Sequence, residues 1–362
     1  MDETDKNQES VEGEDNDNTL GDYPIDTLLI RQESRTIFDV VRRIERDDYI
    51  LYPDFQRDFI WTPVKQSKLI ESVLMRIPLP VFYLAENSKG KMIVVDGLQR
   101  LHTFQRFLKG DFRLELSNRE LNGLSFKQLS AKLQNRIEDC NLIIYSIDSK
   151  VPPQALLDIF DRVNSGVPLT RQQMRNCLFS GMATQFLREQ SQTDLFQKAT
   201  GNSLRRESMK DREIVNRFCA FDLIGESRYK GYMDDFLGKT LEKMNDMPRT
   251  ELKELASRLH RALENNWIVF QEHSFRKFSK GQKKRSQFNV ALWDVMSTGL
   301  SKYSVERVSA KASKIKNEFL LLMQDSDFLD SISLGTNQSN RVKTRFDKVR
   351  LLLGEVFGDN RN

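Results

Sequence analysis

Five consecutive residues, Asp96 to Arg100, bring together a carboxylate, a glycine, an amide and a guanidinium, groups that bind and orient phosphates. The apolar run from Met92 to Val95 precedes them and predicts a buried strand. Apolar residues at helical spacing follow them and predict a helix that ends near Gly110. The free N–H groups of the helix's first turn favour an anion at the glycine turn. The alternative interpretation is an ordinary strand, turn and helix with a surface arginine.

Asp96 and Gln99 are the candidate catalytic side chains of this turn. The Asp96 carboxylate is able to hold a metal ion or to orient an attacking water, and Gln99 is expected to help orient phosphates. The competing interpretation of Asp96 is a cap for the following helix. The three histidines of the chain lie far apart and show neither zinc-site nor HNH spacing, so no dedicated metal site is predicted.

Two other segments offer groups for the same ligand. Gln56 and Arg57 lie in an aromatic segment that contains Pro53, where Arg57 either reaches the anion or stacks on a neighbouring ring. Arg162 and Asn164 lie where a helix is expected to end in a turn, and both carry donors for a nucleotide. The alternative for this second segment is a helix C-cap with an exposed arginine.

A basic run with interleaved phenylalanines suggests a surface for nucleic acid. No acidic residue lies between Glu272 and Asp294. The candidate DNA contacts are Arg276, Lys277, Lys280, Lys283, Lys284 and Arg285. Such a run is able to follow a phosphate backbone while aromatic rings stack on bases. The alternative is a solvated loop.

Four ordered motifs resemble the N-terminal domain of GmrSD-type restriction proteins. They are Pro53–Trp61, Ile77–Pro80, Val95–Leu101 and Phe160–Leu169. The resemblance implies a ParB/sulfiredoxin-like fold with a small mixed sheet. It also draws attention to a polar and basic cluster that enters the last helix as a further phosphate candidate, formed by Thr336, Asn337, Ser339, Asn340, Arg341 and Arg345.

In that family the turn usually reads Asp-Gly-Gln-Gln-Arg and is linked to nucleotide binding and hydrolysis. The resemblance therefore implies a nucleoside triphosphate, with Mg²⁺, as the cofactor. Its expected ligands are Gln56, Arg57, Asp96, Gly97, Gln99, Arg100, Arg162 and Asn164. Leu98 stands where the family has its first glutamine, so we expect binding to survive this change better than hydrolysis does.

Composition excludes several classes of protein. The chain has 362 residues, of which 39% are hydrophobic and 30% charged, and no apolar stretch is long enough to cross a membrane. The N-terminal ten residues lack the basic and apolar parts of a secretory signal. The three cysteines are widely spaced and contain no CxxC pair, which favours reduced thiols in a cytoplasmic protein.

Charge is distributed unevenly along the chain. Residues 1–18 carry eight acidic residues and one lysine, a net charge of −7. The formal charge of the whole chain is +4, so the remaining residues carry +11. A basic folded body favours an anionic partner. The acidic tail is expected to be disordered, and it either shields a basic surface or aids solubility.

The helical and strand periods change near residue 150. Residues 1–20 are expected to form the acidic tail, residues 21–150 an α+β domain with the ParB/sulfiredoxin-like fold, and residues 151–362 an all-α domain. No internal repeat is found.

The preferred function at this level is a nucleotide-binding, DNA-associated component of a prokaryotic restriction or anti-phage system. Nucleotide hydrolysis is a further expectation. The alternatives are a non-enzymatic DNA-binding or assembly module and a metal-dependent DNA nickase that acts through the ParB-like domain. Because no HNH motif is present, cleavage is expected from a partner nuclease, and a methyltransferase partner and a homo-oligomer remain open.

Overall fold

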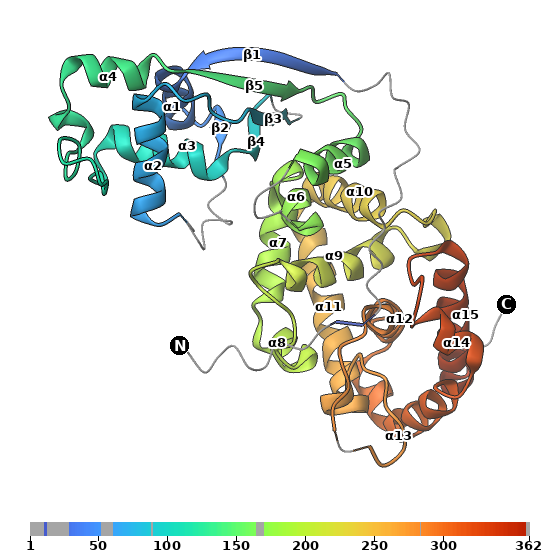
Figure 1. Cartoon of the computed structure of the whole chain (residues 1–362). Helices are drawn as coiled ribbons and strands as arrows, with labels where there is room; N and C mark the ends of the chain where they lie inside the picture. The colour runs from blue at the N-terminus through green and yellow to red at the C-terminus, as the bar shows by residue number, and fades with distance from the viewer. Residues whose placement is uncertain are drawn as a thin grey trace. The chain divides into compact units, whose positions relative to one another are not determined.

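The contacts divide the chain into two units (Figure 1). The computed structural model describes residues 11–12, 29–51, 61–87, 90–163, 170–282 and 284–359. One unit, the N-terminal domain, extends to Leu178. The other, the helical domain, begins at Phe179 and includes the described N-terminal residues Val11 and Glu12. This boundary lies after the expected one at residue 150, because the two helices that follow residue 150 pack on the sheet of the N-terminal domain.

A mixed sheet organises the N-terminal domain. Its strands in the described residues are β1 (Ile30–Thr36), β2 (Tyr49–Ile50), β3 (Phe82–Glu86), β4 (Met92–Asp96) and β5 (Asn141–Ile147). Their order across the sheet is β1-β5-β3-β4-β2. The β1/β5 and β3/β4 pairs are antiparallel, whereas the β3/β5 and β2/β4 pairs are parallel. The small mixed sheet expected from the sequence is therefore confirmed.

Helices connect or follow the strands of this domain. They are α1 (Ile37–Glu45), α2 (Pro63–Leu74), α3 (Leu98–Lys109), α4 (Ala131–Glu138), α5 (Pro153–Val163) and α6 (Arg171–Leu178), with a 3₁₀ turn at Phe126–Gln128. The side chains of Thr36 and Thr62 accept hydrogen bonds from backbone N–H groups in the first turns of α1 and α2. Both caps satisfy donors that a helix end leaves unpaired.

The two faces of the sheet bury different sets of residues. Along β4, Val94 packs into the core formed with α1, α2, α3 and α4. Its neighbour Val95 points to the opposite face, where it shares a cluster with Phe160 of α5 and Met174 of α6. This alternation follows from the two-residue period of a strand. A strand buried on both faces is uniformly apolar, as the run from Met92 to Val95 is.

The helical domain follows the expected pattern. Its helices in the described residues are α7 (Met182–Ser191), α8 (Asp194–Thr200), α9 (Lys210–Leu223), α10 (Met233–Asp246), α11 (Arg249–Phe270), α12 (Val290–Leu300), α13 (Val305–Leu322), α14 (Ser326–Ser331) and α15 (Ser339–Phe357). Short 3₁₀ turns lie at Glu226–Arg228 and Gln271–His273. The prediction of an α+β domain followed by a mostly helical region is confirmed.

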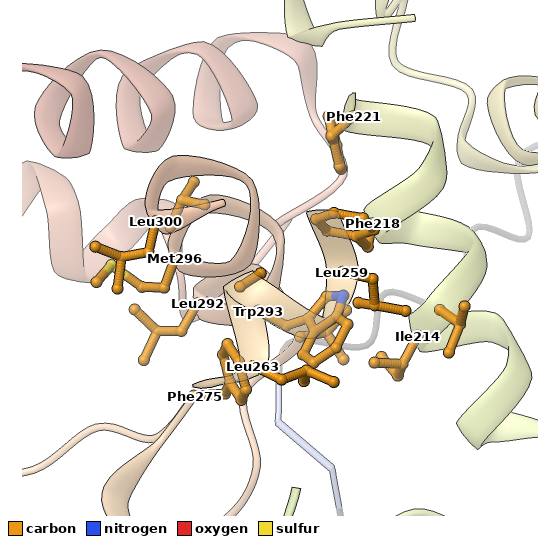
Figure 2. Close-up of a cluster of buried hydrophobic side chains, with 14 of the residues drawn as sticks. Ile214, Phe218, Phe221, Leu259, Leu263, Phe275, Leu292, Trp293, Met296 and Leu300 are labelled. Carbon is orange, nitrogen blue, oxygen red and sulfur yellow. The ribbon is translucent and has the colours of Figure 1, made fainter. Parts of the chain in front are cut away.

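Helix α12 forms the centre of the helical domain (Figure 2). All of its residues except Gly299 are buried, which places the helix inside the core, and most of them are apolar. Its Trp293 packs against Phe275 and Phe196, with ring centroids 4.6 Å and 5.8 Å away. Helices α9, α11 and α15 contact α12 around this core.

A buried ion cluster joins three of these helices. Asp294 of α12 accepts two hydrogen bonds from Arg217 of α9, at 2.8 Å and 2.6 Å, and one from Arg345 of α15 at 2.8 Å. Arg345 also donates to the backbone carbonyl of Thr336. Burial alone lowers the pKa of an arginine, yet the Asp294 carboxylate raises the pKa of Arg217 above its ordinary value. Arg345, a phosphate candidate in the sequence, is thus an interior residue with 0% exposure.

Replacing Asp294 with asparagine should destabilise the helical domain strongly. Two buried guanidinium groups would lose their anion, and breaking such a cluster costs about 3–5 kcal/mol. Urea unfolding of the full chain, followed by tryptophan fluorescence, measures the change. The matched control is Asp347→Asn, which weakens exposed pairs with Lys343 and Arg350 and should cost less than about 0.5 kcal/mol. Equal losses in both variants would contradict a structural role for the buried cluster.

Candidate nucleotide site at the start of α3

A single glycine connects β4 to α3. Gly97 has φ of 101°, a left-handed conformation that side-chain-bearing residues rarely adopt. A Cβ at this position would lie 2.3 Å from Cδ1 of Phe82. The turn therefore requires glycine for two reasons, its backbone conformation and the close approach of the Phe82 ring.

Arg100 connects this turn to the segment that precedes β3 through hydrogen bonds. Its guanidinium donates to the backbone carbonyls of Pro80 and Val81, the latter at 3.0 Å. It also donates to Oδ2 of Asp96 at 2.8 Å and lies over the ring of Phe82, 4.2 Å from the centroid. One side chain thereby joins the end of β4, the first turn of α3 and the segment that enters β3.

The charges of Arg100 and Asp96 balance each other in this turn. Arg100 is only 9% exposed, and burial lowers its pKa, while the Asp96 charge and hydrogen bond oppose that shift. The pair thus carries opposite charges that compensate each other inside the turn. The described contacts use three of the five N–H donors of Arg100. In this structure Arg100 positions the turn, and the phosphate contact expected of it from the sequence stays a prediction.

The first turn of α3 offers donors to an anion. Gly97 occupies the N-cap position, and no side chain caps the helix. The backbone N–H groups at the start of a helix have no intrahelical partner and carry the positive end of the helix dipole. The Oε1 atom of Gln99 is buried and has no hydrogen-bond partner among the described residues. Leu98, by contrast, packs against the core on the α1–α4 face.

The structure describes only some of the other residues that the sequence predicts as ligands. Gln56, Arg57 and Asn164 lie outside the described residues, in segments 52–60 and 164–169. Arg162 is exposed in the last turn of α5. Helix α5 packs on the same strand that ends at Asp96, since Phe160 and Val95 share one cluster. The structure therefore brings the α5 helix to β4.

The predicted DNA contacts are not all at the surface. Arg276 is 1% exposed and donates to the carbonyls of Ser286 and Thr200, so it stabilises the interior. The interleaved phenylalanines Phe275, Phe278 and Phe288 are buried in the helical core and are not available for stacking on bases. Burial of these four side chains removes four of the nine expected aromatic and basic groups from the surface.

The other basic residues of the run are less buried than Arg276 where the structure describes them. Lys280 and Lys284 are exposed, whereas Lys283 lies outside the described residues. Lys277 is partly buried and forms an ion pair with Glu12, and Arg285 donates to the carbonyl of Gly201 at 3.2 Å. The exposed basic surface is therefore narrower than the sequence suggests.

A pocket that sequence reasoning missed lies near the opposite end of β4. It has a volume of about 260 Å³ and includes Arg31, Arg35 and Arg43 in its lining. Each of these arginines is paired with a carboxylate: Arg31 with Asp148, and Arg35 and Arg43 with Asp39. Compensated charge makes this pocket a poorer phosphate site than the α3 turn. The strand β1, which contributes Arg31 and Arg35, has a polar sequence that gave no strand signal.

No group of three or more histidine, cysteine or carboxylate residues within the described ranges is arranged to hold a metal ion. In the same part of the chain, no helix combines the length and apolar character needed to span a bilayer.

The fold and the turn define an α+β domain built on a strand, a glycine turn and a helix. Residues 35–180 match the family described as GmrSD restriction endonuclease, N-terminal domain. This part of the chain is therefore a GmrSD-type N-terminal domain, as the four sequence motifs predicted, and the family description associates it with restriction. Neither a curated protein nor a solved structure matches the chain. The ParB/sulfiredoxin-like fold thus stays a prediction.

Replacing Gly97 with alanine should destabilise the N-terminal domain more than replacing Gly110 does. Both glycines have positive φ, which costs about 1–3 kcal/mol in another residue. A Cβ at Gly110 meets no atom within 4 Å, whereas at Gly97 it would overlap Phe82. Urea unfolding of the two variants separates backbone strain from steric overlap. Equal losses would show that the Phe82 contact does not restrict the turn.

Proposed function

We propose that the chain is a nucleotide-binding, DNA-associated component of a restriction or anti-phage system, and that the turn between β4 and α3 binds the phosphates. The family match of residues 35–180 supports the restriction context. The observation that carries the nucleotide proposal is the uncapped start of α3, whose backbone N–H groups are donors for a phosphate. The buried, unpartnered Oε1 atom of Gln99 is an acceptor, and it suits a hydroxyl or amino group of the nucleotide.

Compensation of the Asp96 charge makes an anion acceptable at this turn. An uncompensated carboxylate beside the first turn of α3 would itself interact with the helix dipole and repel phosphate. Arg100 neutralises that carboxylate from its buried side. The backbone N–H groups at Gln99 and Arg100 then face a site with little opposing charge, which suits a phosphate oxygen.

The remaining roles follow from residue chemistry. Gln99 would donate through its amide group to the nucleotide, and exposed Arg162 would approach from α5. Gln56, Arg57 and Asn164 complete the proposed ligand set on the strength of the family resemblance. One oxygen of Asp96 pairs with Arg100, and the other is suited to a Mg²⁺ ion that also contacts phosphates.

The presence of Leu98 favours a site that binds nucleotide but hydrolyses it inefficiently. The side chain at this position packs toward the core, and it has no amide to orient a nucleotide or a water. Nucleotide hydrolysis by Asp96 and Gln99 is the stronger form of the proposal. Cleavage of DNA is assigned to a partner chain.

A DNA-binding module without nucleotide chemistry is the second candidate. The exposure of Lys280 and Lys284 favours it, because both side chains are available to a phosphate backbone. In that case the α3 turn would serve only to hold the fold of the N-terminal domain, and DNA binding would not depend on nucleotide.

Titration calorimetry with nucleoside triphosphates and Mg²⁺ tests the nucleotide site. The variant Gln99→Leu should bind about tenfold more weakly than the unmodified chain, since the hydrogen bonds of the Gln99 amide group to the nucleotide are lost. Gln105→Leu makes the same change six residues later on α3 and should leave affinity unchanged. Phosphate release in the same samples reports whether bound nucleotide is hydrolysed.

Three outcomes separate the candidates. Binding that falls in Gln99→Leu alone supports the nucleotide site. Absence of binding for all nucleotides tested would overturn it. Salt-dependent DNA binding that persists without any nucleotide effect would select the second candidate.

A further inference from the structure

The acidic N-terminal segment is anchored to the helical domain at Glu12. The backbone N–H of Glu12 donates to the carbonyl of Phe288 at 2.8 Å, and its carbonyl accepts from the N–H of Val290 at 3.1 Å. Val11 packs against the helical core. The short blue segment beside α12 in Figure 1 is this anchor.

The Glu12 side chain is directed to the basic run. Its Oε1 atom lies 2.5 Å from Nζ of Lys277, which also donates to Oγ of Ser333 at 2.8 Å. Lys277 was one of the predicted DNA contacts, and here a carboxylate of the chain itself occupies it. A carboxylate and a phosphate oxygen compete for the same ammonium group.

The sequence around the anchor strengthens this competition. Glu9, Glu14 and Asp15 lie within three residues of Glu12 in the sequence. The segment that Glu12 anchors therefore carries further carboxylates, and a carboxylate pairs with the same cations as a phosphate does.

We propose that the anchored Glu12 occupies Lys277 as an internal substitute for a nucleic-acid phosphate, so that DNA must displace Glu12 to bind at Lys277. This inference rests on the DNA association of the proposed function. The occupant is the chain's own N-terminal segment, because the contacts of Glu12 include two backbone hydrogen bonds and an ion pair. Displacement would couple DNA binding to release of the N-terminus.

Zero-length carbodiimide cross-linking of the full chain detects the Glu12–Lys277 contact in the absence of DNA. It should join the Glu12 carboxylate to the Lys277 amine within one chain, as identified by mass spectrometry. Addition of a short DNA duplex should suppress this cross-link. A cross-link between two chains, or one whose yield DNA leaves unchanged while it binds, would overturn the proposal.

DNA affinity of charge variants supplies the second measurement. Glu12→Gln removes one charge and the ion pair, and it should tighten DNA binding about tenfold at low salt, with a smaller effect as salt rises. Glu254→Gln removes one charge from an exposed position of α11 and should change affinity much less. Equal effects of the two variants would overturn the proposal, because net charge alone would then explain both.

The two proposals fail in different ways. If the intramolecular cross-link forms but no DNA binding is found, the DNA association is wrong and the displacement proposal falls with it, although the anchor is real. If DNA binds and the cross-link is absent, the displacement proposal alone is overturned.

Discussion

The N-terminal domain depends on one buried guanidinium. Arg100 connects the end of β4, the start of α3 and the segment before β3, and its charge is balanced by Asp96. The Phe82 ring lies against both Gly97 and the Arg100 guanidinium, so the left-handed turn and the buried arginine share one packing neighbour. The shape of the proposed phosphate site, an uncapped helix start beside a compensated carboxylate, is a consequence of that constraint.

Basic residues in this chain hold its interior together as well as covering its surface. Arg217 and Arg345 balance Asp294 at the centre of the helical domain, and Arg276 binds backbone carbonyls near the loop after α11. A net charge of +11 outside the acidic segment therefore overstates the charge presented to a ligand. One cation of the basic run, Lys277, is already paired with Glu12 of the chain itself.

Much of the framework was predictable because its signals are local. The apolar run of β4, the glycine turn, the threonine caps of α1 and α2 and the period of the long helices each follow from neighbouring residues. Strand β1 was missed because its polar sequence lies at a sheet edge, where pairing with β5 determines the structure. The structural role of Arg100 could not be predicted from the sequence either. Arg100 binds the backbone carbonyls of Pro80 and Val81, about twenty residues away, and a backbone carbonyl leaves no mark in the residue types. The short helices α8 and α14 have too few residues for a clear period.

The most direct test of this account is the stability of Arg100→Ala in the absence of any ligand. Urea unfolding of the full chain, with hydrogen exchange at β4 and α3 to follow the N-terminal domain, measures it. If Arg100 has this structural role, the variant should lose more than about 2 kcal/mol of unfolding free energy. Asp96 loses its counter-charge, and two buried carbonyls lose their donors. Unchanged stability, with unchanged exchange at the turn, would contradict the account and return Arg100 to the role of a ligand contact.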